Sequence, residues 1–438
     1  MAGFRTSQIG VAANHPFPTK RQAMVPRRLN QDNFADCFHP GMEVYAPGCA
    51  GHSSVFESWL RQAPDCADGV RFTGVHIPTV NHFDFAALHA NARQRVIFLS
   101  AELRDSWLAG RVDYLPMTYS GTWQWLAETA CFDVALLQVS PPDADGVCSL
   151  GVACDFSPAA WPRSMKVLAH VNPAMPHTRG PSIPWNRIDA VVEQGAALLE
   201  APDPPADPLM EAVATRVAGL VPDRASLQLG LGKLQSALLR ALCTRRGLRI
   251  HSGMVSDGLL ELIAHGALAQ DPDAVVAGVA IGTRALYDAV SAQVHFREVG
   301  YTHDHAVLRA IPRLMAVNSA LSVDLLGQVN GECLGDRQVS GVGGLTDFLR
   351  GARLSAGGRG IIALPSCTAS GTSRIVPLLP AGPVSVARVD ADCITTEHGV
   401  AELRHLGVHE RARAVIAIAD PRHRESLERE WHALSRRF

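Results

Sequence analysis

The stretch Asn318–Gly335, NSALSVDLLGQVNGECLG, follows directly on the apolar run Leu314–Val317 and is the best guide to the fold. Four consecutive apolar residues followed by polar ones predict a buried strand that ends in a turn. Ser322 stands just beyond this strand, and Gly327 and Gly331 punctuate the segment behind it. A turn that presents a polar side chain is a common place for chemistry. Ser322 is therefore the first candidate site residue.

Working outward from this stretch, strand-like and helical runs alternate along the chain. Strand-like runs lie at 43–48, 96–99, 132–139, 165–171, 227–229, 274–279, 314–317, 360–364 and 383–389. Such alternation predicts α/β domains with mostly parallel sheets. The proline-rich segment 200–208 predicts a stiff linker. We therefore expect an N-terminal arm (1–28) and two similar open α/β domains (29–204 and 205–438).

Composition excludes several classes of protein. With 47% hydrophobic and 19% charged residues in 438, the chain has a large core, and a net charge of −2 gives no footprint for nucleic acid. The ten cysteines form no C-x-x-C pair, which favours reduced thiols over a metal site or a disulfide frame. No apolar run approaches the ~18 residues that a membrane span needs. We expect a cytoplasmic enzyme without a metal, a nucleic-acid partner or a membrane partner.

Two glycine-rich turns could bind an anion through backbone amides. Gly230 and Gly232 precede a helical run, and amides at such a position can face a phosphate or a carboxylate. Gly341, Gly343 and Gly344 precede a second helix that we expect to begin near residues 346–347. The amides of this second turn could stabilise a developing oxyanion. The alternative in both cases is a close turn that has no room for a side chain.

Titratable residues near other predicted strand ends add further candidates. Glu397 and His398 lie in TTEHG (395–399), which we expect at a strand end before a helix from about Val400. Glu397 could orient a substrate or only cap the helix. His398 could act as a base or face solvent, and a histidine that faces solvent is the commoner outcome. His251 heads the segment HSGMVSD (251–257) before a predicted helix over 258–265.

The motifs together resemble those of the acetyl-CoA hydrolases and acyl-CoA:carboxylate CoA-transferases. They comprise RVDYLP (111–116), QVSPPD (138–143), VNPAMPHT (171–178), LQLGLG (227–232), GTRALYD (282–288), SGVGGLTDF (340–348) and TTEHGVAELR (395–404), in addition to 318–335. The resemblance implies paired α/β domains with the active site between them, an acyl-CoA substrate and coenzyme A as a cosubstrate. It also implies no tightly bound cofactor and a homodimer or higher homo-oligomer.

The resemblance also implies side chains that this chain lacks. It places the catalytic glutamate at Ser322, a glutamine at Leu345 and, in close relatives, a glutamate at Gly253. In the family the glutamate carries first the acyl group and then CoA. A hydroxyl group cannot form the thioester that this exchange requires.

Three interpretations remain open for the reaction. The first, which we favour, is transfer of an acyl group from acyl-CoA to water or another acceptor, through an ester on Ser322. This serine would need a base, drawn from Glu397, Glu332, His398, His251 and Asp324. The second is CoA transfer with the carboxylate role moved to Glu332 or Glu397. The third is a non-catalytic protein that binds acyl-CoA.

Overall fold

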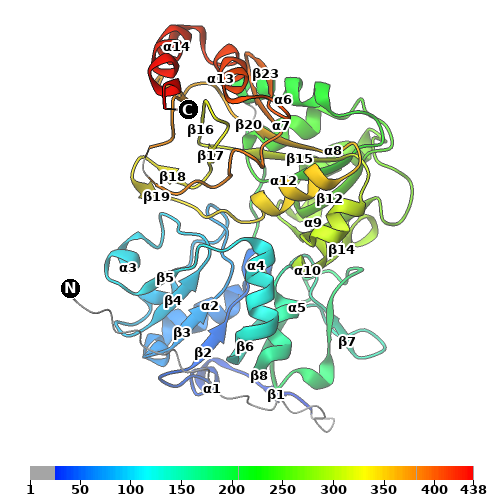
Figure 1. Cartoon of the computed structure of the whole chain (residues 1–438). Coiled ribbons are helices and arrows are strands. Elements are labelled where there is room, and N and C mark those ends of the chain that lie inside the picture. The colour runs from blue at the N-terminus through cyan, green and yellow to red at the C-terminus, as the bar shows by residue number, and fades with distance from the viewer. Residues whose placement is uncertain (1–24, 206, 381, 438) are drawn as a thin grey trace, which may run out of the picture.

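The computed structural model describes residues 25–205, 207–380 and 382–437, and it divides the secondary structure between two halves of the chain. Figure 1 shows the N-terminal half, coloured blue to green, below the C-terminal half. Between the end of β10 at Glu193 and the start of α6 at Pro208, the described residues form no helix or strand, and the segment expected as a linker falls in this stretch. The ten cysteines are free. No helix of the described residues is long and apolar enough to cross a membrane.

The N-terminal half is built on an eight-stranded sheet in which every pair of neighbouring strands is parallel. In sheet order its strands are β1 (Arg27–Arg28), β10 (Ala190–Glu193), β8 (Ser164–Val171), β6 (Phe132–Val139), β2 (Glu43–Tyr45), β3 (Arg71–Thr73), β4 (Arg93–Val96) and β5 (Val112–Tyr114). The central strand β6 and the second part of β8, from Val167 to Val171, are mostly apolar and buried on both faces, as expected for a parallel sheet covered on both sides.

The C-terminal half is built on a second eight-stranded sheet, parallel except for its last pair. In sheet order its strands are β14 (His295–Phe296), β13 (Val275–Ala280), β12 (Arg249–Val255), β11 (Ser226–Leu229), β15 (Leu314–Ser319), β20 (Arg359–Ala363), β22 (Cys393–Thr396) and β23 (Gly399–Glu402). The predicted fold class, two open α/β domains with mostly parallel sheets, is confirmed.

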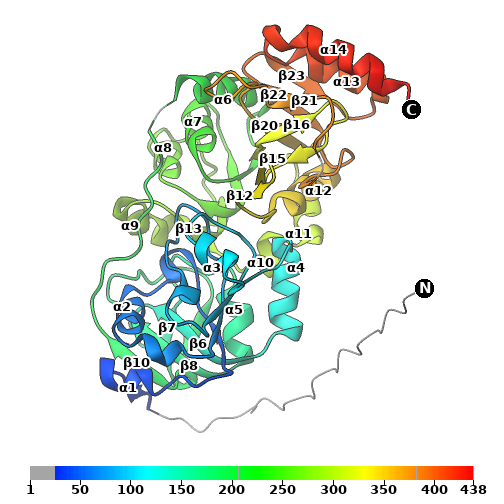
Figure 2. The same ribbon diagram turned by 90° about the vertical axis from the view of Figure 1, so that its left-hand side faces the viewer.

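Helices and short strand pairs connect and cover these sheets (Figures 1 and 2). The helices are α1 (Gln31–Ala35), α2 (Ser54–Gln62), α3 (Arg104–Leu108), α4 (Tyr119–Gln124), α5 (Ser157–Ala160), α6 (Pro208–Leu220), α7 (Lys233–Ala241), α8 (Gly258–Ala264), α9 (Arg284–Gln293), α10 (Val299–Thr302), α11 (His305–Ala310), α12 (Leu345–Leu354), α13 (Val408–Ala417) and α14 (Pro421–Ser435). The minor strands are β7 (Val147–Ser149) with β9 (Ser182–Pro184), β16 (Ser322–Asp324) with β17 (Val329–Asn330) and β21 (Ile375–Val376), and β18 (Cys333–Leu334) with β19 (Arg337–Gln338).

The halves meet over an extensive contact rather than at a single hinge. One apolar cluster is continuous from Phe132 in β6 to Leu227 in β11. α10 packs against α4, and a Cβ atom at Gly300 would lie 2.4 Å from the indole nitrogen of Trp123. Figure 1 places α4, α5 and α10 together at this junction. Residues at the junction are therefore held from both sides.

Several boundaries differ from the sequence-based expectations. The strand expected at 96–99 is β4, which ends at Val96. The expectation was misplaced because charged residues alternate along β4, and a search for apolar runs does not find such a strand. The segment 383–389 contains no strand, and its backbone pairing is a single bridge from Val386 to Val329. Most of the expected arm (residues 1–24) lies outside the described residues, and Arg27–Arg28, which we had assigned to the arm, belong to the first sheet.

Candidate functional site

The glycine loop, residues 340–344 before α12, is held by the N-terminal half. The amide of Leu99 donates to the carbonyl of Ser340 (3.3 Å), and the amide of Tyr119 donates to that of Gly343 (3.0 Å). A Cβ atom at Gly341 would lie 2.1 Å from the carbonyl oxygen of Ile97, so no other residue fits at this position. Gly343 has a φ of +54°, in the left-handed region that favours glycine. Contacts between the halves thus account for two of the three glycines.

Gly344 needs a different explanation. Its φ of −88° suits any residue, so backbone strain does not require glycine here. A Cβ atom at this position would, however, lie 2.4 Å from the Nε2 atom of His303. The missing side chain therefore makes room for an imidazole group that lies directly against the loop.

His303 lies in the turn between α10 and α11 and is 1% exposed. Its ring centroid is 4.4 Å from that of Phe348 in α12 and 5.0 Å from that of Tyr119 in the N-terminal half. Its Nδ1 atom is 2.9 Å from the hydroxyl oxygen of Thr302. Burial lowers the pKa of His303 to about 3, so the imidazole is neutral at physiological pH.

Gly253 in β12 faces the same imidazole. A Cβ atom at position 253 would lie 3.0 Å from Cε1 and 3.2 Å from Nε2 of His303. The resemblance implied a glutamate at this position in close relatives. The imidazole of His303 now fills the space into which such a side chain would extend. We call Gly253, His303 and Gly344, with the flanking rings of Phe348 and Tyr119, the imidazole site.

His251, a predicted site residue, lies two residues before Gly253 on β12 and supports this site from behind. Its Nε2 atom is 3.1 Å from the carbonyl oxygen of Thr302, a group that can only accept a hydrogen bond. Nε2 therefore carries a proton and donates it. Burial lowers the pKa of His251 to about 4. Its contact is with the end of α10, which leads into His303, so the geometry fits an orienting role.

Ser322 lies at the start of β16, in the small three-stranded sheet, and its side-chain partner is an amide. Its Oγ atom accepts a hydrogen bond from Nδ2 of Asn330 (3.3 Å). Asn330 is fixed in this orientation because its Oδ1 atom accepts from the amides of Glu332 (3.1 Å) and Cys333 (2.9 Å). An amide NH₂ group cannot take a proton from a hydroxyl group, so this contact supplies no base.

Glu332 is 6% exposed and joins the two halves. Its carboxylate accepts hydrogen bonds from Ser385 Oγ (2.8 Å), Gln338 Nε2 (2.7 Å) and the hydroxyl group of Tyr114 (3.1 Å), which belongs to β5 of the N-terminal half. Burial and the nearby charge of Glu332 raise the pKa of Tyr114. Three donors satisfy this carboxylate, and its geometry fits a structural link.

Glu397 and His398 lie in the hairpin turn between β22 and β23, so the helix expected from about Val400 was wrong. The carboxylate of Glu397 accepts from the amide (2.9 Å) and the hydroxyl group (2.5 Å) of Ser366, which follows β20. His398 Nε2 is 3.5 Å from Glu397 Oε1. Since β20 and β22 are adjacent parallel strands, Glu397 fixes one carboxyl-end loop to its neighbour.

Gly230 and Gly232 form the turn from β11 into α7, as the sequence indicated. Gly232 has a φ of +110° and is followed by Lys233, the first residue of the helix. A Cβ atom at Gly230 would make an ordinary contact of 3.6 Å with Gln235. Conformation thus accounts for Gly232, and binding of an anion at this turn stays a prediction.

A groove between the halves leads to the glycine loop. It encloses about 850 Å³, including the part open to solvent, and Leu99 and Val339 lie in its walls on either side of the contact with Ser340. Arg104 from the N-terminal half and Arg337 from β19 line it and are both exposed. Neither guanidinium group makes an ion pair with a described residue.

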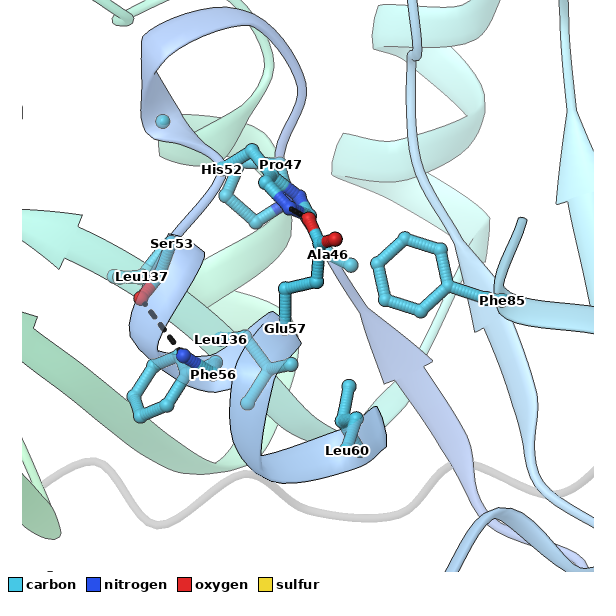
Figure 3. A pocket seen from close by; sticks show the side chains of 11 residues that line it. Ala46, Pro47, His52, Ser53, Phe56, Glu57, Leu60, Phe85, Leu136 and Leu137 are labelled. Carbon is cyan, nitrogen blue, oxygen red and sulfur yellow. Dashed lines mark hydrogen bonds and ion pairs between the residues drawn. The ribbon is translucent and has the colours of Figure 1, made fainter. Parts of the chain in front are cut away.

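A smaller pocket lies wholly within the N-terminal half (Figure 3). At its edge His52 Nε2 is 2.7 Å from a carboxylate oxygen of Glu57, and the hydroxyl group of Ser53 caps α2 by accepting from the amide of Phe56 (3.1 Å). The hydrogen bond from His52 lowers the pKa of Glu57. None of the predicted site residues lines this pocket, and its polar groups serve the start of α2.

The comparisons with known proteins agree with this architecture. Residues 20–199 match the acetyl-CoA hydrolase/transferase N-terminal domain, and residues 282–431 match the C-terminal domain of the same name. The 4-hydroxybutyrate coenzyme A transferase of Clostridium kluyveri is 40% identical over 350 residues, which cover 77% of this chain and 82% of that protein. The chain belongs to the acetyl-CoA hydrolase/transferase family. It is accordingly an acyl-CoA transferase/hydrolase enzyme, of a family that uses coenzyme A as a cosubstrate.

Solved structures of this family superpose closely on the chain. The crystal structure of RipA from Yersinia pestis has a TM-score of 0.87 at 28% identity and covers 93% of this chain and 98% of its own. That of a 4-hydroxybutyrate CoA-transferase from Porphyromonas gingivalis has a TM-score of 0.77 at 29% identity and covers 94% and 98%.

Sequence reasoning missed His303. It lies in a short turn, GYTHD (300–304), that carried no glycine pattern, capping box or repeated motif. The available signal was Gly253: a glycine inside a buried strand often marks the close approach of another group.

Proposed function

We propose that this enzyme transfers the acyl group of an acyl-CoA thioester to water or another acceptor, and does not exchange CoA between two carboxylates. One observation carries the proposal. Position 253, beside the glycine loop, has no side chain, and the imidazole of His303 fills the space in front of it. CoA exchange needs a carboxyl group to carry CoA as a thioester, and neither Ser322, where the resemblance places the family's glutamate, nor the imidazole of His303 offers such a carbon.

The carboxylates close to the predicted site support the same conclusion. Glu332 is held by three donors and Glu397 by the amide and hydroxyl groups of Ser366. To attack a thioester, either would have to give up these hydrogen bonds inside the protein, where a lost partner costs about 1–3 kcal/mol. CoA transfer by a relocated carboxylate is therefore the less supported alternative.

Transfer through an ester on Ser322 is a second version of the proposal. What supports it is the position of Ser322, which follows β15 at the carboxyl edge of the main sheet, where ligands commonly bind. Its recorded partner is the amide donor of Asn330, so a base would have to come from another group. The imidazole site, in contrast, already combines an imidazole group with the glycine loop.

The groove between the halves is the place we propose for the CoA moiety. Arg104 and Arg337 lie on its opposite walls, and guanidinium groups suit the phosphates of CoA. We also keep Gly230 and Gly232 as a proposed contact for an anionic group. A cytoplasmic location and a homodimer or higher homo-oligomer remain predictions, to be measured by fractionation and by light scattering.

Thiol release and CoA exchange, measured in parallel over a panel of acyl-CoA thioesters, test the proposal. We expect release of free CoA with one equivalent of carboxylic acid, at a rate that added acetate or butyrate does not increase. We expect no isotope from a labelled carboxylate in the acyl-CoA pool. Labelled acyl-CoA that forms as fast as thiol is released would overturn the proposal.

A further inference from the structure

His303 has an unpartnered nitrogen atom that faces the glycine loop. The residue is 1% exposed, and no described residue forms a hydrogen bond to its Nε2 atom. This atom lies 2.4 Å from the point where a Cβ of Gly344 would be and 3.2 Å from the corresponding point of Gly253. A water molecule or a ligand can complete the hydrogen bond of such an atom.

The hydroxyl group of Thr302 contacts both Nδ1 of His303 (2.9 Å) and the carbonyl oxygen of Glu298 (3.3 Å), and it has one hydrogen atom to donate. The carbonyl oxygen can only accept. When the hydroxyl group donates to this carbonyl group, it accepts from Nδ1, and Nε2 then presents a lone pair to the glycine loop.

The surrounding aromatic rings fix the orientation of the imidazole ring of His303. Phe348 and Tyr119 flank the imidazole from two different halves of the molecule, at centroid distances of 4.4 and 5.0 Å. His251 fixes the turn that carries the ring by donating to the carbonyl of Thr302 (3.1 Å). The titratable residues next in sequence are Asp304, whose carboxylate accepts from the amides of Ala306 and Val307, and His305, whose Nε2 atom lies 3.6 Å from an oxygen of Asp347.

We propose that His303 is the general base of acyl transfer, accepting through Nε2 the proton of a water molecule that attacks the thioester. This inference rests on the proposed function and deepens it by naming the residue that activates the acceptor. The glycine loop and the imidazole group are in contact, and in this mechanism the thioester carbonyl group lies beside both. Position 253, lacking a side chain, leaves the ring its place.

The step balances as follows. The water oxygen forms a bond to the thioester carbonyl carbon, the water proton moves to Nε2, and the π electrons of the carbonyl group move to its oxygen, which backbone amides of the glycine loop stabilise. When the tetrahedral intermediate collapses, the C–S bond breaks and the imidazolium group returns its proton to the sulfur of CoA. The products are a carboxylic acid and free CoA.

The oxyanion formed in this step also favours the proton transfer. Burial keeps the pKa of His303 at about 3, which ensures that the imidazole is neutral before the reaction. A negative charge that develops within the same buried site raises the affinity of the ring for a proton, since opposite charges attract strongly where water is excluded.

Variants of His303 and Thr302 in the full-length enzyme test this role. We expect His303→Ala to lower thiol release by about 10²–10⁴-fold, the usual contribution of a general base, and added imidazole to restore part of it. Thr302→Val removes the hydroxyl group that contacts Nδ1 of His303 and should lower the rate of thiol release. Thr302→Ser keeps this hydroxyl group and should keep the wild-type rate. His305→Asn is the matched control, because His305 is two residues away and half exposed, and its rate should stay within about twofold of wild type.

The outcomes separate the two proposals. If wild-type enzyme releases thiol and folded His303→Ala releases it equally fast, the base is wrong although the function stands. If Thr302→Val, with an unchanged circular dichroism spectrum, keeps the full rate, the tautomer argument fails. If wild-type enzyme instead exchanges CoA between carboxylates, the proposed function itself fails.

Discussion

The imidazole site and the surroundings of Ser322 differ in the hydrogen-bond partners of their polar side chains. At Ser322 the hydroxyl group accepts from Asn330, whose amide is itself fixed by two backbone groups, so the contact of this hydroxyl group is with a donor and not with a base. At the imidazole site Nε2 of His303 has no partner among the described residues and faces a loop of backbone amides. Ser322 is the more visible departure from the family motif, yet its contacts fit a catalytic role less well than those of the imidazole site. A candidate reaction centre is better recognised by an unsatisfied group than by an unusual residue.

Among the substitutions outside His303 itself, Gly344→Ala has the largest expected effect. The added Cβ atom would lie 2.4 Å from Nε2 of His303 and would push the ring away from the glycine loop. We expect thiol release to fall by about 10²–10³-fold, as when a group that stabilises an oxyanion is lost. Gly219→Ala in α6, where nothing lies within 4 Å of the new atom, is the control. A Gly344→Ala enzyme with the wild-type rate would show that the imidazole site is not the reaction centre.

Gly253→Glu sharpens the comparison through stability. The new side chain meets the His303 ring at 3.0 Å, and such overpacking should lower the free energy of unfolding by about 1–3 kcal/mol in urea titrations. In His303→Ala the space is free, so we expect the double variant to regain most of the loss and to acquire carboxylate-dependent CoA exchange. Additive destabilisation would mean that the two positions do not share one space.

The pH dependence of stability tests the buried His251. Its pKa is lowered to about 4 in the folded protein, against about 6.5 in an unfolded chain, so the unfolded state binds more protons between these values. Stability contributed by the neutral ring is complete above pH 6.5 and is lost as the pH falls towards 4. His251→Asn should flatten the curve by about 1.4 kcal/mol per pH unit over this range, measured by urea titration. An unchanged slope would contradict a buried, neutral His251.

The smallest expected effect is that of Ser322→Ala. Because Oγ makes one hydrogen bond to an amide and contacts no base, we expect thiol release within about threefold of wild type. Intact-mass measurement after mixing with acyl-CoA should show no acyl adduct. An adduct that disappears in Ser322→Ala, together with a large loss of rate, would restore the serine as nucleophile and reverse the comparison.

The fold was predictable because its signals are local. Apolar runs such as Phe132–Val139 and Leu314–Val317 are buried strands, and the prolines at 200–208 lie between the two sheets. The strand β4 was expected too far along the chain because charged residues alternate along it. No spacing rule revealed that 383–389 is not a strand and pairs with Val329 through a single bridge.

The site was less predictable because it depends on contacts between distant segments. His303 is fifty residues from Gly253, forty-one from Gly344 and far from Tyr119 in the other half, and none of these separations follows a periodicity. The glycine loop was found from its composition, yet two of its glycines serve the contact between the halves. Only coordinates could separate that packing requirement from the space left for an imidazole.

The contacts between the N-terminal half and the glycine loop have a consequence for turnover. Leu99 and Tyr119 bond to carbonyls of the loop, and the carbonyl oxygen of Ile97 fills the place of a side chain at Gly341. Moving the two halves apart would break these two hydrogen bonds. We therefore expect acyl-CoA to enter along the groove, and we expect the rate of entry to depend on the length and stiffness of the pantetheine arm.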